Sequence, residues 1–321
     1  MNVDKESKEK SIAIKEEDIK RLEDAGFRFL GKYKHSAIKT CEWTRKALRN
    51  DGFCYKQKFY GIASHRCLQF TPALPFCTHR CLFCWRDINI TYPKWIGNVD
   101  DPKDLLEEAI EKQREILQGF KGNPKVDKQR FYEAMLPNQI AISLAGEPTL
   151  YPKLPELIDE TKKRGMSSFL VSNGTIPNMI KRIIKNPPTQ LYITLPAPDE
   201  DIYIKTCNPI LKNSWKKIIK SLSLLKLFEE KARIVVRLTL VKNLNFFKPE
   251  VYGKIIKEFQ PQFVEVKSFM SVGFARARLP YEAMPLHEEI KKFSKKLAKC
   301  CNYKIIDEKK ESRVVLLKRN K

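Results

Sequence analysis

CLQFTPALPFCTHRCLFCW, residues 67–85, is the stretch of sequence that decides the fold. It begins with a strand-like segment, Cys67–Thr71, and continues into a loop that carries three cysteines. Cys77, Cys81 and Cys84 have the spacing C-x3-C-x2-C, with an aromatic residue before the last of them. Three thiolates this close together can converge on one small iron–sulfur cluster and leave one metal position open, as catalytic metal sites do.

Zinc is the alternative metal for this loop, because it could take the three cysteines plus His79. Zinc sites usually pair C-x2-C with a second pair of ligands farther along the chain. Nothing after Cys84 supplies such a pair, since Cys207 stands alone in the sequence. Three structural buried cysteines fit poorly in a loop that also contains Thr78 and Arg80. The pattern therefore favours an iron–sulfur cluster.

Outward from this loop the sequence alternates between strand and helix patterns. The expected strands are 139–144, 169–172, 190–195, 234–241 and 263–267, and the expected helices are 103–119, 153–164, 177–185, 213–231, 249–258 and 286–299. About six β-then-α units imply an α/β protein with a parallel sheet covered on both faces. A partial (βα)6 TIM-type barrel and an open doubly wound sheet both fit. In either, the chemistry belongs at the C-terminal ends of the strands.

The chain is predicted to divide near residue 65. Residues 1–65 are expected to form an N-terminal, cysteine-bearing extension, with a short amphipathic helix that ends at Gly26. Residues 66–321 are expected to form the barrel. The lysine-rich run at the end of the chain, through Lys321, is predicted to be a frayed basic tail.

The charge balance points to a phosphate-rich partner. The chain has 61 Lys+Arg and 38 Asp+Glu, a net charge of +23, which suits nucleic acid or an anionic membrane surface, unless the lysines serve only solvation. No run of about 18 apolar residues exists, so no membrane span is expected. Met1–Lys8 lacks the apolar stretch of a signal peptide. We therefore expect a cytoplasmic monomer that binds nucleic acid.

The cysteines are concentrated in one part of the chain. There are nine, an odd number that argues against a disulfide framework in a protein without an export signal. Six lie between Cys41 and Cys84, and so many thiols in a reducing compartment indicate a metal. Cys207, Cys300 and Cys301 are predicted not to be ligands.

Two strand ends carry polar residues suited to a ligand. The stretch SLAGEPT, Ser143–Thr149, contains Gly146, which lets a ligand approach the backbone closely, and Glu147, which could accept from a ligand ammonium. The stretch VSNGT, Val171–Thr175, follows the next strand. It either contacts the same ligand or is a simple Asn-Gly turn.

The cysteine loop resembles that of the radical S-adenosylmethionine superfamily, whose members have a partial (βα)6 barrel. The resemblance implies a [4Fe–4S] cluster on the three loop cysteines and S-adenosyl-L-methionine chelated to its open iron. Ser143, Gly146 and Glu147 resemble the strand end that holds the amino group of the cofactor, although Ala145 stands where glycine, serine or threonine is commoner. At the next strand end, the matching residues for the ribose or carboxylate are Ser172 and Asn173.

Three upstream cysteines narrow the family. Cys41, Cys54 and Cys67 are spaced C-x12-C-x12-C. With the loop, this resembles the 4-demethylwyosine synthases, which modify tRNA, over roughly residues 35–318. The matching stretches are Cys54–Ile62, His65–Cys67, Phe83–Arg86, Gly146–Tyr151 and Glu265–Ser268. Pro196 is a departure, because an aspartate is expected soon after that strand.

The resemblance implies a particular radical reaction, that of a carbon–carbon lyase or synthase. The substrates would be N1-methylguanosine beside the anticodon of tRNA-Phe and pyruvate, the two-carbon donor. An adenosyl radical would take a hydrogen from the N1-methyl group, and the resulting carbon radical would attack the carbonyl carbon of pyruvate before ring closure. An external electron donor would be needed.

The resemblance also implies a second [4Fe–4S] cluster, on Cys41, Cys54 and Cys67. Pyruvate could be held on this cluster, as a Schiff base on a lysine, or both. Lys56 and Lys58 lie between two of these cysteines and are the first candidates, and Lys267 at a strand end is the next.

The basic surface for tRNA is predicted to include several arginines and one helix. These are Arg80, Arg86, Arg276, Arg278 and the helix 291–299. Two other functions stay open. The chain could be a radical enzyme acting on another substrate, such as a protein, or a non-enzymatic RNA-binding module stabilised by zinc.

Overall fold

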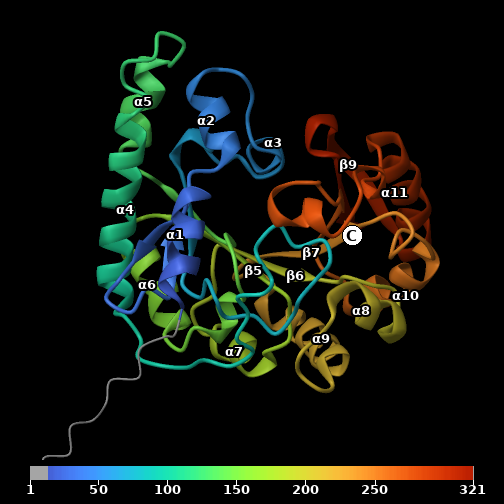
Figure 1. The fold of residues 1–321 in the computed structure, drawn as a ribbon. Helices are drawn as coiled ribbons and strands as arrows, with labels where there is room; N and C mark the ends of the chain where they lie inside the picture. Colours follow the sequence, from blue (N-terminus) through green and yellow to red (C-terminus); the bar gives the residue numbers. More distant parts are fainter. Residues whose placement is uncertain (1–13, 321) are drawn as a thin grey trace, which may run out of the picture.

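A curved ten-stranded sheet forms the centre of the protein in the computed structural model, which describes residues 14–320 (Figure 1). The stretch Met1–Lys8 and Lys321 lie outside the described residues. Six consecutive strands are parallel: β3 Cys67–Thr71, β4 Gln139–Ile142, β5 Ser167–Ser172, β6 Gln190–Thr194, β7 Arg233–Leu240 and β8 Phe263–Ser268. The sheet does not close, which confirms the predicted partial barrel.

The helices predicted between the strands are present. They are α4 Pro102–Gln118, α6 Leu154–Lys163, α7 Pro177–Arg182, α9 Ser214–Ser223, α10 Pro249–Phe259 and α11 His287–Cys301. They lie along the outer side of the curved sheet (Figure 1). In α4, Leu105, Leu106 and Ala109 are fully buried at helical spacing, so the amphipathic face seen in the sequence packs into the core. Two further helices, α5 Lys128–Ala134 and α8 Glu200–Cys207, were not predicted.

The N-terminal segment adds to the same sheet. After α1, Glu16–Asp24, the short strands β1, Arg28–Leu30, and β2, Ser36–Ile38, pair antiparallel with each other, and β2 pairs antiparallel with β3. Helix α2, Glu42–Leu48, packs against α4 and α5 through Leu48 (Figure 1), whereas α3, Tyr55–Tyr60, packs on the inner side of the sheet through Tyr60. The sheet therefore runs across the boundary expected near residue 65.

The C-terminal run is a strand rather than a frayed tail. Val314–Arg319 forms β10, which pairs antiparallel with β8 on one side and with β9, Tyr303–Lys309, on the other. Residues 314–317 of β10 are all buried. The apolar stretch VVLL supplies a strand buried on both faces, and the lysines that follow it concealed this signal. The prediction of a basic tail was therefore wrong as far as Arg319.

The inner side of the sheet changes from apolar to polar along the strands. Phe169, Tyr192 and Val235 form a small buried cluster, against which Tyr60 of α3 packs. The next inward-facing positions carry Thr194 and other polar residues, described below.

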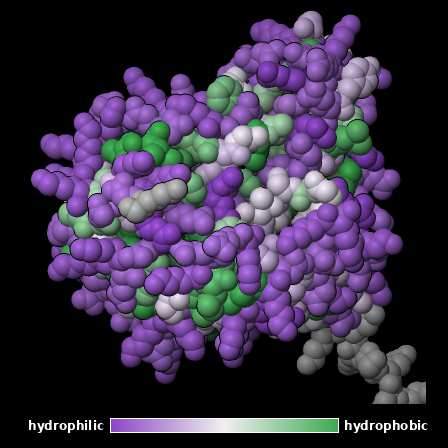
Figure 2. All heavy atoms as spheres, turned by 180° about the vertical axis from the view of Figure 1, so that it is seen from behind, coloured by the Kyte–Doolittle hydropathy of each residue, from purple (hydrophilic) through white to green (hydrophobic). Residues whose placement is uncertain are grey.

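The outer surface is mainly hydrophilic, with small separate hydrophobic patches on the face drawn in Figure 2. Over the described range, no helix combines the length and the apolar character that a membrane crossing requires.

Candidate active site

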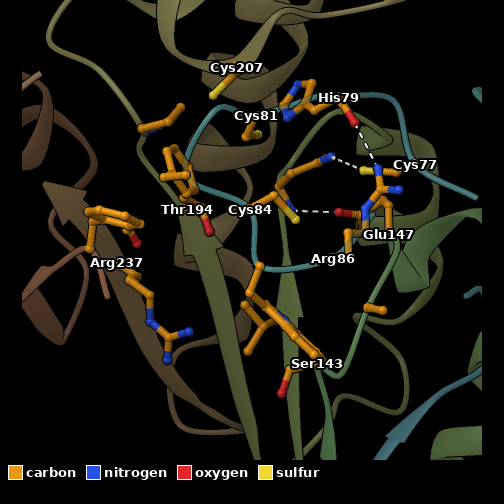
Figure 3. Close-up of a pocket in the computed structure, with 18 of the residues that line it drawn as sticks. Cys77, His79, Cys81, Cys84, Arg86, Ser143, Glu147, Thr194, Cys207 and Arg237 are labelled. Atoms are coloured by element: carbon orange, nitrogen blue, oxygen red, sulfur yellow. Dashed lines mark hydrogen bonds between the residues drawn. The ribbon is translucent and has the colours of Figure 1, made fainter. Parts of the chain in front are cut away.

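The three loop cysteines open onto one cavity of about 300 Å³. Cys77, Cys81 and Cys84 line it, together with residues from the C-terminal ends of β4 to β8 (Figure 3). The predicted cofactor residues Ser143, Gly146, Glu147, Ser172 and Asn173 line the same cavity. The structure thus brings these residues together where the parallel sheet was expected to carry its chemistry.

Two arginines hold the cysteine loop. Arg86 is 5% exposed and donates to the carbonyl oxygens of His79 at 3.0 Å and Ile90 at 2.9 Å. Arg278 donates to the carbonyl oxygens of Leu82, at 3.2 Å, and Cys84. Their fixed donors satisfy carbonyl groups of a loop that has no regular secondary structure.

The tRNA-binding prediction is therefore corrected for Arg86. The Arg86 side chain is buried, so it is not available as a surface charge, whereas Arg278 is half-buried and directs part of its guanidinium at the loop. Arg80 and Arg276 are exposed, as the prediction requires.

The loop thiols are buried in a way that suits a metal. Burial raises the pKa of Cys77 to about 12, and the Arg86 guanidinium opposes this shift. Burial also raises the pKa of Cys84, again against the effect of Arg86. Buried thiols of this kind keep their protons until a metal displaces them, so metal binding and proton release are coupled.

Cys207 does not stand alone in the folded chain. It is the last residue of α8, and it lies beside Cys81 in the cavity (Figure 3). Hydrogen bonding to Cys207, together with burial, raises the pKa of Cys81 well above its ordinary value. The ligand atoms of His79, Cys81 and Cys207 lie within 4.8 Å of one another. The structure thus places a single further thiol beside the loop, although no second pair of ligands; the sequence did not reveal this because α8 was not predicted.

Glu147 is a buried carboxylate at the cavity wall. Its Oε1 accepts from the Thr149 hydroxyl at 2.6 Å and the Ser172 hydroxyl at 2.8 Å. Its Oε2 accepts from the backbone N–H of Asn173 at 2.7 Å. Burial raises the pKa of Glu147, and these hydrogen bonds oppose the shift. The bonds fix the carboxylate in the position where the sequence placed an ammonium-binding group.

Gly146 is required by close backbone contacts. Its φ is +69°, and a Cβ atom there would lie 1.8 Å from the carbonyl oxygen of Ala73 and 2.8 Å from that of Phe76. No side chain fits, so the strand end can pass directly beside the segment that leads into the cysteine loop.

The upstream cysteines come from three separate elements. Cys41 and Cys54 immediately precede α2 and α3, and Cys67 is the first residue of β3. Burial, helped by the neighbouring Cys41 thiol and opposed by the Lys56 ammonium, raises the pKa of Cys54 to about 11. Burial raises the pKa of Cys67 as well, and the thiols of Cys41 and Cys54 contribute to that shift. Cys41 and Cys54 therefore lie within electrostatic reach of Cys67.

The three candidate lysines lie in different surroundings. Lys56 is 8% exposed, and its ammonium lies 5.1 Å from the ring centres of Phe169 and Tyr192. Lys267 lines the cavity and donates to the carbonyl oxygen of Ser312 at 2.8 Å. The third candidate, Lys58, has surroundings unlike those of Lys56 and Lys267.

The Lys58 side chain lies at the surface instead. It is 45% exposed, and its ammonium is 2.7 Å from the Asp307 carboxylate and 2.8 Å from the Glu308 carbonyl oxygen, both in β9. Two residues along a short helix are enough to turn a side chain from the interior to solvent, which spacing from the cysteines alone did not reveal.

Sequence reasoning missed a buried polar network around Glu265. Its carboxylate is fully buried and accepts from the hydroxyls of Tyr55 at 3.0 Å, Tyr60 at 2.8 Å and Tyr192 at 3.0 Å. Arg237 lies 3.1 Å from the same carboxylate. The signal was present as a single acidic residue within the apolar strand FVEVKS. The network fastens α3, and with it Lys56, to β6, β7 and β8.

Comparison with known proteins first defines the class. Residues 71–250 match the radical SAM superfamily, and residues 258–319 match the family described as wyosine base formation. The cavity, its cysteine loop and the open parallel sheet are therefore those of a radical S-adenosylmethionine enzyme, with a [4Fe–4S] cluster and S-adenosylmethionine as its cofactors.

Individual relatives then define the family. The S-adenosyl-L-methionine-dependent tRNA 4-demethylwyosine synthase of Pyrococcus horikoshii is 47% identical over 89% of this chain and 84% of its own length. That of Methanocaldococcus jannaschii is 41% identical over 88% and 90%. A solved structure of TYW1 with a bound lysine–pyruvate adduct is 38% identical, with a TM-score of 0.85 over 95% of this chain and 96% of the other. The chain belongs to the tRNA 4-demethylwyosine synthases.

The residues of this chain fit the cofactors of the class. Three thiols at the loop spacing share one cavity, and a fixed carboxylate, Glu147, lies on the same wall. Gly146, where no side chain fits, also lines this cavity. A sulfur donor set of this kind suits an iron–sulfur cluster.

Proposed function

We propose that this enzyme converts N1-methylguanosine beside the anticodon of tRNA-Phe to 4-demethylwyosine, with pyruvate as the two-carbon donor. One observation carries the proposal. One cysteine triplet lines the cavity, and a buried lysine, Lys56, lies within electrostatic reach of Cys54 and Cys67 of the upstream triplet. The TYW1 structure with a lysine–pyruvate adduct supports the choice of donor.

The first cluster and S-adenosylmethionine are assigned to the cysteine loop and the adjacent strand ends. Cys77, Cys81 and Cys84 hold the cluster, and Glu147 accepts from the cofactor's ammonium. Ser143 and Gly146 line the same side, and Ser172 and Asn173 position Glu147 and the ribose or carboxylate. When bound, these groups supply the radical that starts the reaction, with one electron from an external donor.

The second [4Fe–4S] cluster is assigned to Cys41, Cys54 and Cys67. The Lys56 amine is proposed to form a Schiff base with pyruvate, in which the amine nitrogen bonds to the ketone carbon and one water leaves. Burial and the nearby Arg237 guanidinium lower the pKa of Lys56, which favours the neutral, nucleophilic amine. The pKa of Lys267 is lowered to about 8 by the same two causes, so it is the second candidate for this role.

The tRNA is proposed to dock on exposed basic residues. Arg80 and Arg276 are exposed, as are Lys292, Lys295, Lys296 and Lys299 of α11. The modified base must leave its stack to reach the cavity, which costs a few kcal/mol and would be offset by phosphate contacts. We propose that one chain suffices for this, as a monomer.

The direct test is anaerobic reconstitution with iron and sulfide, followed by assay with N1-methylguanosine tRNA, labelled pyruvate and a reductant. The proposal expects label in 4-demethylwyosine. Borohydride reduction should trap labelled pyruvate on the wild type and not on Lys56→Met, whereas the surface variant Lys58→Met should still be labelled. Product that forms equally well without pyruvate would rule out the proposed donor.

A further inference from the structure

The cavity wall opposite Glu147 carries more positive than negative charge. Figure 3 shows Arg237 across the cavity from Glu147 and Cys77. Arg237, Thr239 and Lys267 all line the cavity. Two cations at a cavity wall require an anion, and Glu265 is the only carboxylate among the described residues that pairs with either of them.

The strand register places these residues in two adjacent layers. Arg237 of β7 is opposite Thr194 of β6 and Glu265 of β8. Thr239 and Lys267 are opposite each other in the next layer toward the strand ends. Because side chains two apart on a strand share a face, both layers point into the same interior.

Hydrogen bonds hold one edge of the Arg237 guanidinium, and another edge is available to a ligand. Its Nε and Nη2 each donate to Glu265 at 3.1 Å, and Nη2 also donates to the Tyr55 hydroxyl at 2.9 Å. Its remaining nitrogen, Nη1, makes no hydrogen bond to any residue of the described chain. A guanidinium clamped in this way keeps its free edge in a constant direction without further loss of side-chain entropy.

Lys267 has no carboxylate partner. Its ammonium donates to the carbonyl oxygen of Ser312 at 2.8 Å, and no ion pair forms with it in the range 14–320. An ammonium has three donors, so two remain for a ligand. Its neighbour Thr239 offers a hydroxyl from the same layer.

We propose that Arg237 and Lys267 form the subsite that binds the carboxylate of a small α-keto acid, the two-carbon donor; this inference rests on the proposed function. A guanidinium edge and an ammonium suit a carboxylate. Arg237 lies inside the barrel, before β7 ends at Leu240, which is deeper than an RNA phosphate on the surface would reach. Glu147, the residue assigned to the cofactor's ammonium, lies on the opposite wall of the cavity (Figure 3).

The same subsite explains how the ketone meets the proposed amine. Lys56 and Arg237 both lie against the Tyr192 ring, 5.1 Å and 4.4 Å from its centre. Lys267 lies in the layer next to that of Arg237. A carboxylate held between Arg237 and Lys267 leaves the ketone of the same small molecule free to turn toward Lys56. Arg237 and Lys267 are then binding groups, and Lys56 is the nucleophile.

The test is the KM for pyruvate of the reconstituted full chain, with the rate of S-adenosylmethionine cleavage measured separately in the absence of pyruvate. Lys267→Met removes the charge at similar length, and Arg237→Lys keeps the charge but loses the planar edge. Each should raise the KM about 10- to 100-fold, the loss expected for one charge-assisted hydrogen bond. The rate of cofactor cleavage by each variant serves as the reference for its change in KM. The matched control is Lys163→Met on the exposed face of α6.

Pyruvamide, which has the ketone but no carboxylate, provides a second measurement. Borohydride trapping on the wild type should strongly favour pyruvate over pyruvamide, and this preference should fall in whichever variants fold. An unchanged KM in the variants, or equal trapping of both compounds by the wild type, would overturn the subsite while leaving pyruvate as donor. A wild type that needs no keto acid would instead overturn the proposed function, and the subsite with it.

Discussion

The two cysteine triplets of this chain are built in opposite ways. Cys77, Cys81 and Cys84 belong to one loop between β3 and α4, and two arginines hold its backbone. The upstream thiols of Cys41, Cys54 and Cys67 come from the starts of three different elements. The loop brings its thiols together locally, whereas the upstream triplet depends on how α2 and α3 are held against the sheet.

This contrast explains why α3 carries so much buried polar structure. Tyr55 and Tyr60 at its two ends both donate to Glu265 of β8. Burial raises the pKa of both phenols well above the ordinary value, so each keeps its proton and remains a donor. The network fixes a short helix that would not be stable by itself, and with it the position of Cys54 and Lys56.

The largest effect is expected from the loop. Replacing one loop cysteine, as in Cys81→Ala, should lower S-adenosylmethionine cleavage at least about 10³-fold, because the open iron is lost with the cluster. The release of 5′-deoxyadenosine under reducing conditions measures this. A variant that still cleaved the cofactor at the wild-type rate would contradict the assignment of the loop.

The upstream triplet should behave differently. Cys54→Ala should retain the loop cluster and cofactor cleavage, lose about four of about eight irons per chain, and make no 4-demethylwyosine. Iron analysis with product assay separates the two sites. Loss of both clusters in this variant would show that the two triplets are not independent.

A smaller effect is expected from the network that holds α3. Glu265→Gln leaves Arg237 without its counter-charge, which should cost about 3 kcal/mol in the free energy of unfolding. The upstream cluster should be lost from this variant before the loop cluster during stepwise chelation. Thr149→Ser, which keeps the hydroxyl that faces Glu147, is the control; equal loss of both clusters would contradict the proposed role of the network.

The smallest effect is a pH dependence of pyruvate binding. Burial and the Arg237 guanidinium lower the pKa of Lys267 to about 8, so its charge is present below that pH and lost as the pH rises through it. The groups that face Lys267 are Arg237, Glu265, Cys54, Tyr55 and Arg313. The KM for pyruvate should therefore rise above about pH 8 in the wild type. In Lys267→Met this component should disappear; an unaltered profile would argue against a charged Lys267 in the subsite.

The fold could be predicted because its signals are local. Strand and helix patterns follow one another along the chain, and β3 was placed correctly from Cys67 to Thr71. The antiparallel strands at both ends were missed. β1 and β2 are only three residues each, and the apolar core of β10 is followed directly by basic residues. Short strands and mixed composition give no clear period of two.

The site could be predicted only in part, for the same reason. The spacing of the loop cysteines and the sequence around Glu147 identify site residues directly. Cys207 and Glu265 reach the site through tertiary packing of α8 and β8, which no local pattern encodes. Lys56 and Lys58 were indistinguishable by spacing, and their surroundings differ because one faces the sheet and the other faces Asp307.

The separation of the two triplets is tested most directly by Mössbauer spectroscopy of the chain reconstituted anaerobically with ⁵⁷Fe. The wild type should contain two [4Fe–4S] clusters, and only one of them should change its spectrum when S-adenosylmethionine is added. Cys54→Ala should retain that responsive cluster alone. A colourless wild type with zinc at the loop thiols, or a single cluster that survives Cys81→Ala, would contradict the assignment.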